Sequence, residues 1–168
     1  RSDGYRDVFR RMGYDTVVPA GERLQNSFLK SGLKRINNLV DAYNAVALKY
    51  VAGIGLHDAA RIDGDMTIER ANGSEKIVPL FQNSARSIPQ GDLVYSSQDR
   101  VIAWLGKRDV DSDEFKITDN TSQVLVVVLG NKLTPPTMTK AMVHEIFDLV
   151  SLSCSSATIE FQEVVHSS

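Results

Sequence analysis

The feature that most constrains this 168-residue chain is a helical pattern over residues 36–50, INNLVDAYNAVALKY. Its apolar side chains recur every three or four residues, which predicts a helix with one buried face. Asn37, Asp41 and Asn44 fall together beside that face, although Asn and Asp are poor helix formers because their side chains compete for backbone hydrogen bonds. We therefore expect these side chains to be hydrogen-bonded, with Asn37 or Asn38 as the N-cap.

Three more helices are expected, over residues 5–12, between residues 19 and 32, and over residues 137–154. The second of these is expected to bury Leu24, Phe28 and Leu29.

Strand patterns occupy the middle and the end of the chain. Residues 66–71 and 76–80 flank Asn72-Gly73, which predicts a β-hairpin. Further strands are expected over residues 93–96, 101–105, 123–129 and 157–165, and the unbroken apolar run of 123–129 predicts burial on both faces. Residues 109–121 have the composition of a polar loop. The chain is therefore expected to be one α+β domain, residues 1–168, with a β-rich, sandwich-like sheet, N-terminal helices and one long C-terminal helix.

Composition and charge narrow the functional classes. The lone Cys154 excludes an internal disulfide and favours a reducing compartment. No apolar run approaches the length of a membrane span, so we expect a cytoplasmic protein without a membrane partner. The net charge is −2, but residues 1–35 carry eight Lys or Arg and four Asp or Glu, so this flank is basic. Such a flank could bind phosphates, although a charge bias of this size is more often an ordinary solvated surface.

Several familiar motifs are incomplete. Gly53-Ile54-Gly55 lacks the third glycine of a dinucleotide loop, because Asp58 stands there. Gly106-Lys107 lacks the rest of a phosphate loop, and His144 has no second histidine at helical spacing. The aspartates of residues 109–113 could hold a hard cation, although a solvated acidic turn is the simpler interpretation. We therefore expect no cofactor and no metal.

An ordered series of short segments gives a more specific indication. The segments are INNLVDAYN over residues 36–44, GLHD over 55–58, IERA over 68–71, DLVY over 92–95 and IAWLG over 102–106. Together they resemble the editing domain of the beta subunit of bacterial phenylalanyl-tRNA synthetase, which is built from that subunit's third and fourth modules. Without the catalytic modules of the synthetase, the chain is similar to the free-standing relatives of this domain, whose pattern Trp104 and Arg108 also fit.

The resemblance implies a hydrolase that removes a wrongly attached amino acid from the 3′ end of tRNA. The aminoacylated tRNA end would be the partner. The resemblance places the pocket on the helix, on the loop after it and on the end of the Trp104 strand. Its implied substrate-binding residues are Asp41, Tyr43, Gly55, Asp58, Trp104, Gly106 and Lys107. Our hypothesis for catalysis is that Asn44 and His57 orient water and substrate, while Arg108 and backbone N–H groups near Gly106 stabilise the oxyanion.

The chain also departs from the family pattern. The histidine of the family falls on Gly55, while His57 lies two residues later and would face the same way in an extended segment. The glutamate that recognises the tyrosine hydroxyl falls on Val127, which argues against tyrosine as the amino acid removed.

Structural interpretations of the same residues remain open. Asn44 could serve helix packing, His57 could be an ordinary core or surface histidine, and Asp58 could cap a short turn. Arg108 could pair with Asp109 or Asp111, and Trp104 could be a core residue. A second functional hypothesis is a non-catalytic module that binds a free amino acid or small amine. The editing hypothesis further requires that Asn44 and Arg108 serve one cleft.

Overall fold

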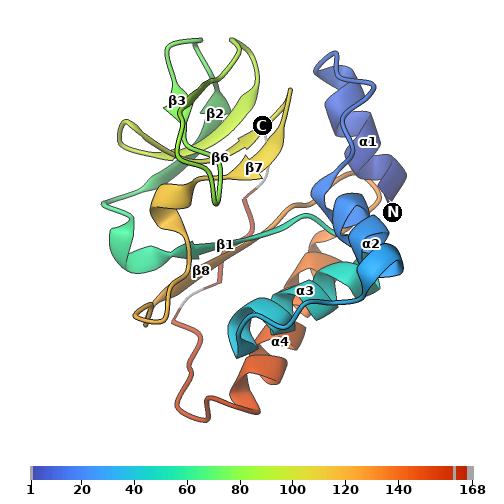
Figure 1. Cartoon of the computed structure of the whole chain (residues 1–168), viewed down its shortest axis with the longest axis vertical. Coiled ribbons are helices and arrows are strands. Elements are labelled where there is room, and N and C mark those ends of the chain that lie inside the picture. Colours follow the sequence, from blue (N-terminus) through green and yellow to red (C-terminus); the bar gives the residue numbers. More distant parts are fainter. Residues whose placement is uncertain (1, 161, 166–168) are drawn as a thin grey trace. The chain divides into compact units, whose positions relative to one another are not determined.

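The computed structural model describes residues 2–160 and 162–165, which form an α+β fold (Figure 1). The helices are α1 (Ser2–Arg11), α2 (Ala20–Ser31), α3 (Asn38–Tyr50) and α4 (Pro136–Ser151). The strands are β1 (Ile54–Asp58), β2 (Met66–Arg70), β3 (Lys76–Ile77), β4 (Arg86–Ser87), β5 (Leu93–Ser97), β6 (Arg100–Leu105), β7 (Asp109–Asp111) and β8 (Val124–Val128). The predicted fold class is confirmed.

The chain forms two compact units, each assembled from separate stretches. Unit 1 contains residues 2–4, residues 21–54 and the described part of 128–168, whereas unit 2 contains residues 5–20 and 55–127. The expectation of a single domain stays a prediction.

The main sheet of unit 2 has the strand order β2-β5-β6-β7 and is antiparallel. Val94, Trp104 and Val110 lie opposite one another on β5, β6 and β7, so their side chains share one face. This face packs on a core cluster that includes Ile77 and Ile88. The next row, Tyr95, Ala103 and Asp111, points to the opposite face.

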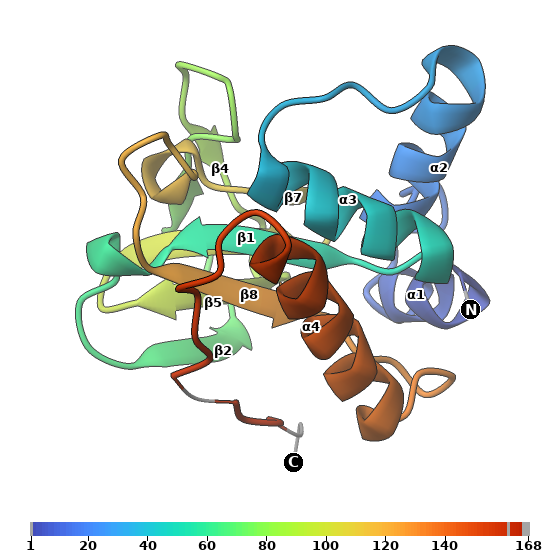
Figure 2. The same ribbon diagram turned by 90° about the horizontal axis from the view of Figure 1, so that it is seen from below.

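Unit 1 is built on two packed helices, α3 and α4 (Figure 2). Val46 of α3 and Met142 and Ile146 of α4 are almost fully buried. Glu145 of α4 accepts hydrogen bonds from Lys49 Nζ at 2.6 Å and from the Tyr50 hydroxyl at 3.0 Å. Apolar burial and this polar clamp together fix α4 against the C-terminal half of α3.

The helix over residues 38–50 begins as the sequence predicts. The Asn37 side chain accepts a hydrogen bond from the Val40 N–H at 2.9 Å, so Asn37 is the N-cap. The helix ends at Val51, which adopts the left-handed conformation with φ of 51° and donates its N–H to the last turn. A β-branched residue is unusual there, because its Cβ crowds the backbone.

The predicted hairpin between residues 66 and 80 is wrong. β2 pairs with β5 and β3 pairs with β4, so the two flanking strands do not pair with each other. The Ala71 N–H donates to the Asp92 carbonyl at 2.7 Å, which keeps this end of β2 on β5. The Glu75 carboxylate accepts from the N–H groups of Asn72 and Gly73, both at 2.9 Å, and closes a local turn. The Asn-Gly signal therefore marks a turn, but the strands around it have other partners.

Four other expectations need correction. Phe28 is 44% exposed and Leu29 is 75% exposed, so α2 does not bury the predicted stripe. β8 is half-buried throughout rather than buried on both faces. The expected loop over residues 109–121 contains β7 and a short 3-10 helix, Asp113–Phe115, anchored by the buried Phe115. The described residues of 157–165 form no strand, and residue 161 lies outside the described residues.

Candidate functional site

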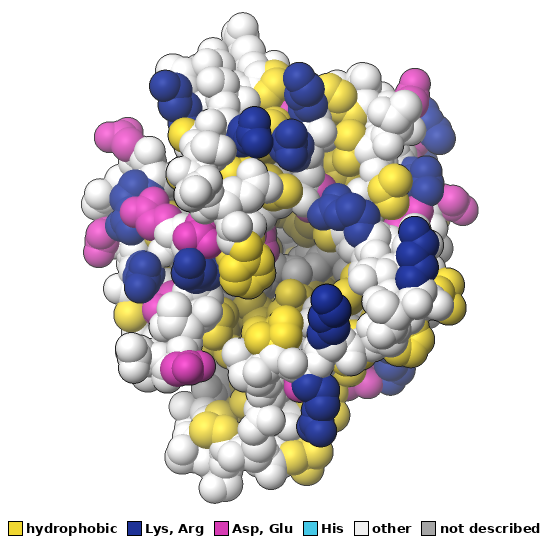
Figure 3. All heavy atoms as spheres, viewed as in Figure 1, with side chains coloured by type: hydrophobic (Ala, Val, Ile, Leu, Met, Phe, Trp, Pro, Cys, Tyr) yellow, Lys and Arg dark blue, Asp and Glu magenta, His cyan; other side chains and the backbone are white. Residues whose placement is uncertain are grey.

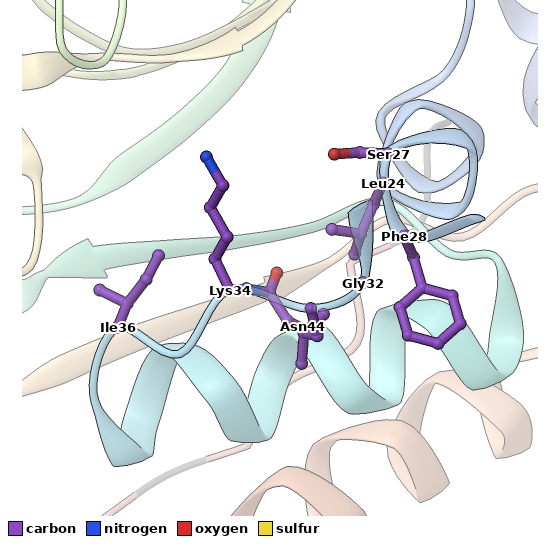
Figure 4. A pocket seen from close by; sticks show the side chains of 8 residues that line it. Leu24, Ser27, Phe28, Gly32, Lys34, Ile36 and Asn44 are labelled. Atoms are coloured by element: carbon purple, nitrogen blue, oxygen red, sulfur yellow. The ribbon is translucent and has the colours of Figure 1, made fainter. Parts of the chain in front are cut away.

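Unit 1 contains an open pocket between α2, the following loop and the middle of α3 (Figure 4). Its lining side chains are mainly apolar, with one amide and one ammonium group among them. They are Leu24, Ser27, Phe28, Leu33, Lys34, Ile36 and Asn44, with Gly32 beside them. Its volume of about 150 Å³ is several times that of a water molecule, roughly 30 Å³, and suits an amino-acid side chain.

Asn44 is the polar group at the helix side of this pocket. Asn44 as a whole is only 9% exposed, yet neither amide atom is among the buried side-chain atoms that lack a hydrogen-bond partner in the described residues. Figure 4 shows the amide pointing away from the axis of α3 toward the segment that carries Lys34. The amide borders the open pocket, where a ligand can hydrogen-bond to it.

The other polar residues of the helix behave differently from Asn44. The Asp41 carboxylate accepts from the Ile36 N–H at 2.9 Å and lies 3.8 Å from the Arg35 guanidinium. Asp41 and the cap Asn37 therefore hold the chain in front of α3, as the polar edge of the pattern predicts. Tyr43, the other predicted substrate residue on α3, is half-buried.

In unit 2, β1 carries Gly55, His57 and Asp58. His57 is 1% exposed, and neither of its ring nitrogens has a hydrogen-bond partner among the described residues. Burial lowers the pKa of His57 to about 4, so the imidazole is neutral near pH 7. A Cβ built on Gly55 would lie 2.9 Å from His57 Nε2, which confirms that residues 55 and 57 face the same way.

Asp58 has the structural role that the sequence left open. Its carboxylate accepts from the Ala60 N–H at 3.2 Å and from the Thr121 hydroxyl at 3.0 Å, and it lies 3.5 Å from Arg61 Nε. It is thus the N-cap of the 3-10 helix Ala59–Arg61. Its assignment to substrate binding stays a prediction.

The loop after β6 is held by Asp92, a residue that our sequence interpretation missed. Its buried carboxylate accepts from Trp104 Nε1 at 2.7 Å and from the Lys107 N–H at 2.9 Å. A side chain on Gly106 would collide with this carboxylate, so only glycine fits there. Trp104 is 1% exposed and belongs to the core, as one interpretation expected. The sequence did hold one sign that an acceptor such as Asp92 is needed, because the indole N–H of a buried tryptophan usually donates a hydrogen bond.

Lys107 and Arg108 project from this loop into solvent. Among the described residues neither side chain forms an ion pair, so the alternative in which Arg108 pairs with Asp109 or Asp111 is not realised. Figure 3 shows Lys and Arg side chains dispersed over the face drawn, with acidic side chains among them.

The predicted site residues are divided between the two units. Asp41, Tyr43 and Asn44 belong to unit 1, whereas Gly55, His57, Asp58 and the residues from Trp104 to Arg108 belong to unit 2. The convergence of Asn44 and Arg108 on one cleft stays a prediction. Within the part of the chain that the structure describes, no three His, Cys, Asp or Glu residues are grouped to hold a metal, and no helix has the length and apolarity of a membrane span.

The sequence and the fold match proteins of one kind. The chain is 32% identical over 107 residues to the phenylalanine–tRNA ligase beta subunit of Streptococcus agalactiae, covering 63% of this chain and 13% of that protein. It is 30% identical over 104 residues to the same subunit of Shewanella oneidensis, covering 61% of this chain and 13% of the subunit. The chain thus spans about an eighth of the length of these relatives.

A solved structure has a similar fold. It is an N-terminal fragment of the phenylalanyl-tRNA synthetase beta subunit from Pyrococcus horikoshii, with a TM-score of 0.50 and 16% identity, covering 65% of this chain and 40% of that chain. A family model described as the B3/4 domain matches residues 4–141, most of the chain. The chain belongs to the B3/4 domain family.

Proposed function

We propose that this protein is an aminoacyl-tRNA deacylase that acts on misacylated tRNA. The observation that carries the proposal is the Asn44 amide, which belongs to a residue only 9% exposed and borders a pocket sized for an amino-acid side chain. Membership of the B3/4 domain family and similarity to phenylalanine–tRNA ligase beta subunits support tRNA as the carrier of that amino acid.

The reaction is hydrolysis of the ester between the amino acid and the terminal ribose. Water adds to the ester carbonyl carbon, the bond to the ribose oxygen breaks, and that oxygen takes up the proton, giving a free amino acid and an uncharged tRNA end. Asn44 orients the ester, and the vicinal ribose hydroxyl shares the proton transfer. Lys107 and Arg108, exposed and without ion pairs among the described residues, supply positive charge for a tRNA phosphate.

The test is release of labelled amino acid from a panel of mischarged tRNAs. We expect Asn44→Ala and Arg108→Ala each to lower kcat/KM at least tenfold for the preferred substrate. Asn26→Ala on α2 and Lys76→Ala on β3 are matched controls, since both residues are exposed. If both site variants deacylate every mischarged tRNA as fast as the parent protein, the assignment is wrong.

A second candidate function is a non-catalytic module that binds a free amino acid or small amine. It is favoured by the chemistry of the pocket, whose lining includes no carboxylate or imidazole that could act as a base. Both functions predict thermal stabilisation by free amino acids. Only the deacylase predicts tRNA binding that weakens steeply with salt, because phosphate contacts release counterions. Amino-acid stabilisation without tRNA binding or ester hydrolysis would favour the binding module.

A further inference from the structure

The segment that runs from α2 into α3, residues 23–40, carries charge of one sign. It contains two Lys and two Arg and no Asp or Glu. The Arg35 guanidinium lies 3.8 Å from the Asp41 carboxylate, whereas Lys34 is exposed and forms no ion pair among the described residues. The Lys34 ammonium group is therefore available to an anionic ligand.

Large apolar side chains of the same segment face solvent. Phe28 is 44% exposed, Leu29 is 75% exposed and Ile36 is 63% exposed. Single exposed apolar residues are common on folded proteins, but a group of them within one short segment indicates an interaction surface. The ring of Phe28 gives this surface a flat face on which a planar ligand can stack.

The exposed ring and the ammonium group belong to one site. Phe28, Lys34 and Ile36 all line the pocket that Asn44 borders, and all four residues lie in unit 1. Figure 4 shows Phe28 and Ile36 at opposite ends of the pocket, with Lys34 extending away from α3 between them. No carboxylate is among the described side chains that line the pocket. An anionic group at its mouth would thus meet attraction from Lys34 without repulsion from the lining.

An unpaired nucleotide matches this combination of groups. Its base has a planar face for stacking on an aromatic ring, and its phosphate carries negative charge for a lysine. A base inside a duplex has no free face, so the match is to single-stranded RNA. An acidic peptide would supply negative charge without a planar ring attached to each charged unit.

We propose that Phe28 and Lys34 hold one unpaired nucleotide of an RNA strand at the mouth of the Asn44 pocket. The base stacks on the Phe28 ring, and the Lys34 ammonium group contacts the phosphate. The inference rests on the proposed deacylase function in one respect, since there the nucleotide is the 3′-terminal one of tRNA and its aminoacyl group points to Asn44. Phe28, which the sequence predicts to be buried, is then a binding residue because it is exposed.

The direct test measures the affinity of the full chain for two labelled RNA strands by fluorescence anisotropy. One strand contains about six adenosine nucleotides, a length within the range that single-strand-binding folds cover. The other is the matched abasic strand, which has the same phosphates and no bases. We expect the adenosine strand to bind at least about fivefold more tightly, because only its bases can stack. Equal affinities for the two strands would overturn the nucleotide site.

Variants assign the two contacts. Phe28→Ala should weaken binding of the adenosine strand at least about fivefold and leave the abasic strand unaffected, whereas Phe28→Trp should retain binding because an aromatic ring is kept. Lys34→Gln should weaken binding of both strands. It should also reduce the slope of log affinity against log salt by about 0.7, the value for one phosphate of a single strand. Unchanged binding in Phe28→Ala, or an unchanged slope in Lys34→Gln, would overturn the proposal.

The controls are two exposed residues of unit 1 that do not line the pocket. Leu152→Ala removes an apolar side chain and Lys140→Gln removes a positive charge. Both variants should bind the two strands as the parent protein does. A labelled peptide of alternating glutamate and phenylalanine tests the protein alternative. If this peptide binds as tightly as the adenosine strand and competes with it, the surface serves an acidic protein partner and the RNA site is overturned.

Kinetics with mischarged tRNA separate this proposal from the deacylase function. Phe28→Ala should raise KM at least about fivefold and change kcat by less than about twofold, because the ring positions the nucleotide and takes no part in the hydrolysis. Hydrolysis at the parent rate by both Phe28→Ala and Lys34→Gln would remove the nucleotide site while the deacylase stands. RNA binding that needs both side chains, without hydrolysis of any tRNA, would keep the nucleotide site and remove the deacylase.

Discussion

At the scale of single residues, Asp92 is the buried group on which the loop after β6 depends. Replacing it with alanine would leave the Trp104 and Lys107 N–H groups without their acceptor. We expect Asp92→Ala to lower the free energy of unfolding by roughly 3 kcal/mol, since hydrogen bonds to charged groups are strong and both donors would stay buried or half-buried. Urea denaturation measures the loss.

The matched control for this prediction is Asp99→Ala, because Asp99 is exposed. A change of less than about 0.5 kcal/mol is expected for it, as for most surface substitutions. If both variants lose the same stability, Asp92 does not anchor the loop.

His57 gives the fold a definite pH dependence. Its pKa is lowered from 6.5 to about 4 in the folded protein, so the unfolded chain binds the proton more readily. The free energy of unfolding therefore has its full value above pH 6.5. It falls by up to roughly 3 kcal/mol as the pH decreases toward about 4. Urea denaturation between pH 4 and pH 7 should show this loss. His57→Phe should reduce the slope, and His144→Ala, at an exposed position, should retain it.

The sequence predicted some of these residues and missed others for identifiable reasons. The cap Asn37 and the buried Asn44 were predictable, because poor helix formers beside an apolar face need a local explanation. The role of Asp92 was not, because its partner Trp104 lies on β6 and is brought near by the sheet register.

At the scale of elements, α2 depends on Gly21 to approach the end of α3. A Cβ on Gly21 would lie 2.7–2.8 Å from backbone atoms of Val51 and Ala52, too close for a real contact. We expect Gly21→Ala to destabilise the protein by about 1–3 kcal/mol, because the backbone must shift to relieve this overpacking. Thermal denaturation monitored by circular dichroism measures the loss.

Gln25→Ala is the control on the same helix, at an exposed position. It replaces one good helix former with another, so its effect should be within about 0.5 kcal/mol. A stabilising Gly21→Ala would contradict the close approach.

Helices were easier to predict than strand partners. The pattern of residues 36–50 agrees with α3 because helix capping and amphipathicity are local. The Asn72-Gly73 signal failed because β2 pairs with β5, whose residues lie more than twenty positions further along the chain. The apolar stripe of α2 was predicted to be buried but is exposed, because periodicity indicates an apolar face and does not indicate what covers it.

At the scale of the whole molecule, the two units share their connecting strands. β1 passes from unit 1 to unit 2 after Ile54, and β8 returns to unit 1 at Val128. Because β1 and β8 are hydrogen-bonded to each other, we expect unfolding of one unit to disrupt the other. Trp104 fluorescence reports unit 2 and helical circular dichroism is dominated by unit 1, so the two melting curves should coincide.

The midpoint of the Trp104 fluorescence curve and that of the circular dichroism curve can each shift independently of the other. Two curves whose midpoints differ by several degrees would show that the units unfold separately. Asp92→Ala should then shift the fluorescence curve and leave the circular dichroism curve in place, whereas in a coupled protein it should shift both curves equally.

The segmented make-up of unit 1 has a practical consequence for anyone who wants the Asn44 pocket in isolation. A gene shortened at one point cannot encode the pocket together with α4, the helix that packs on α3, because the pocket segment and α4 are separated in the sequence by the whole main sheet of unit 2. A minimal polypeptide with both α3 and α4 needs a spliced gene. In that gene the stretch between residues 54 and 128 is removed, and a short artificial linker joins these two residues.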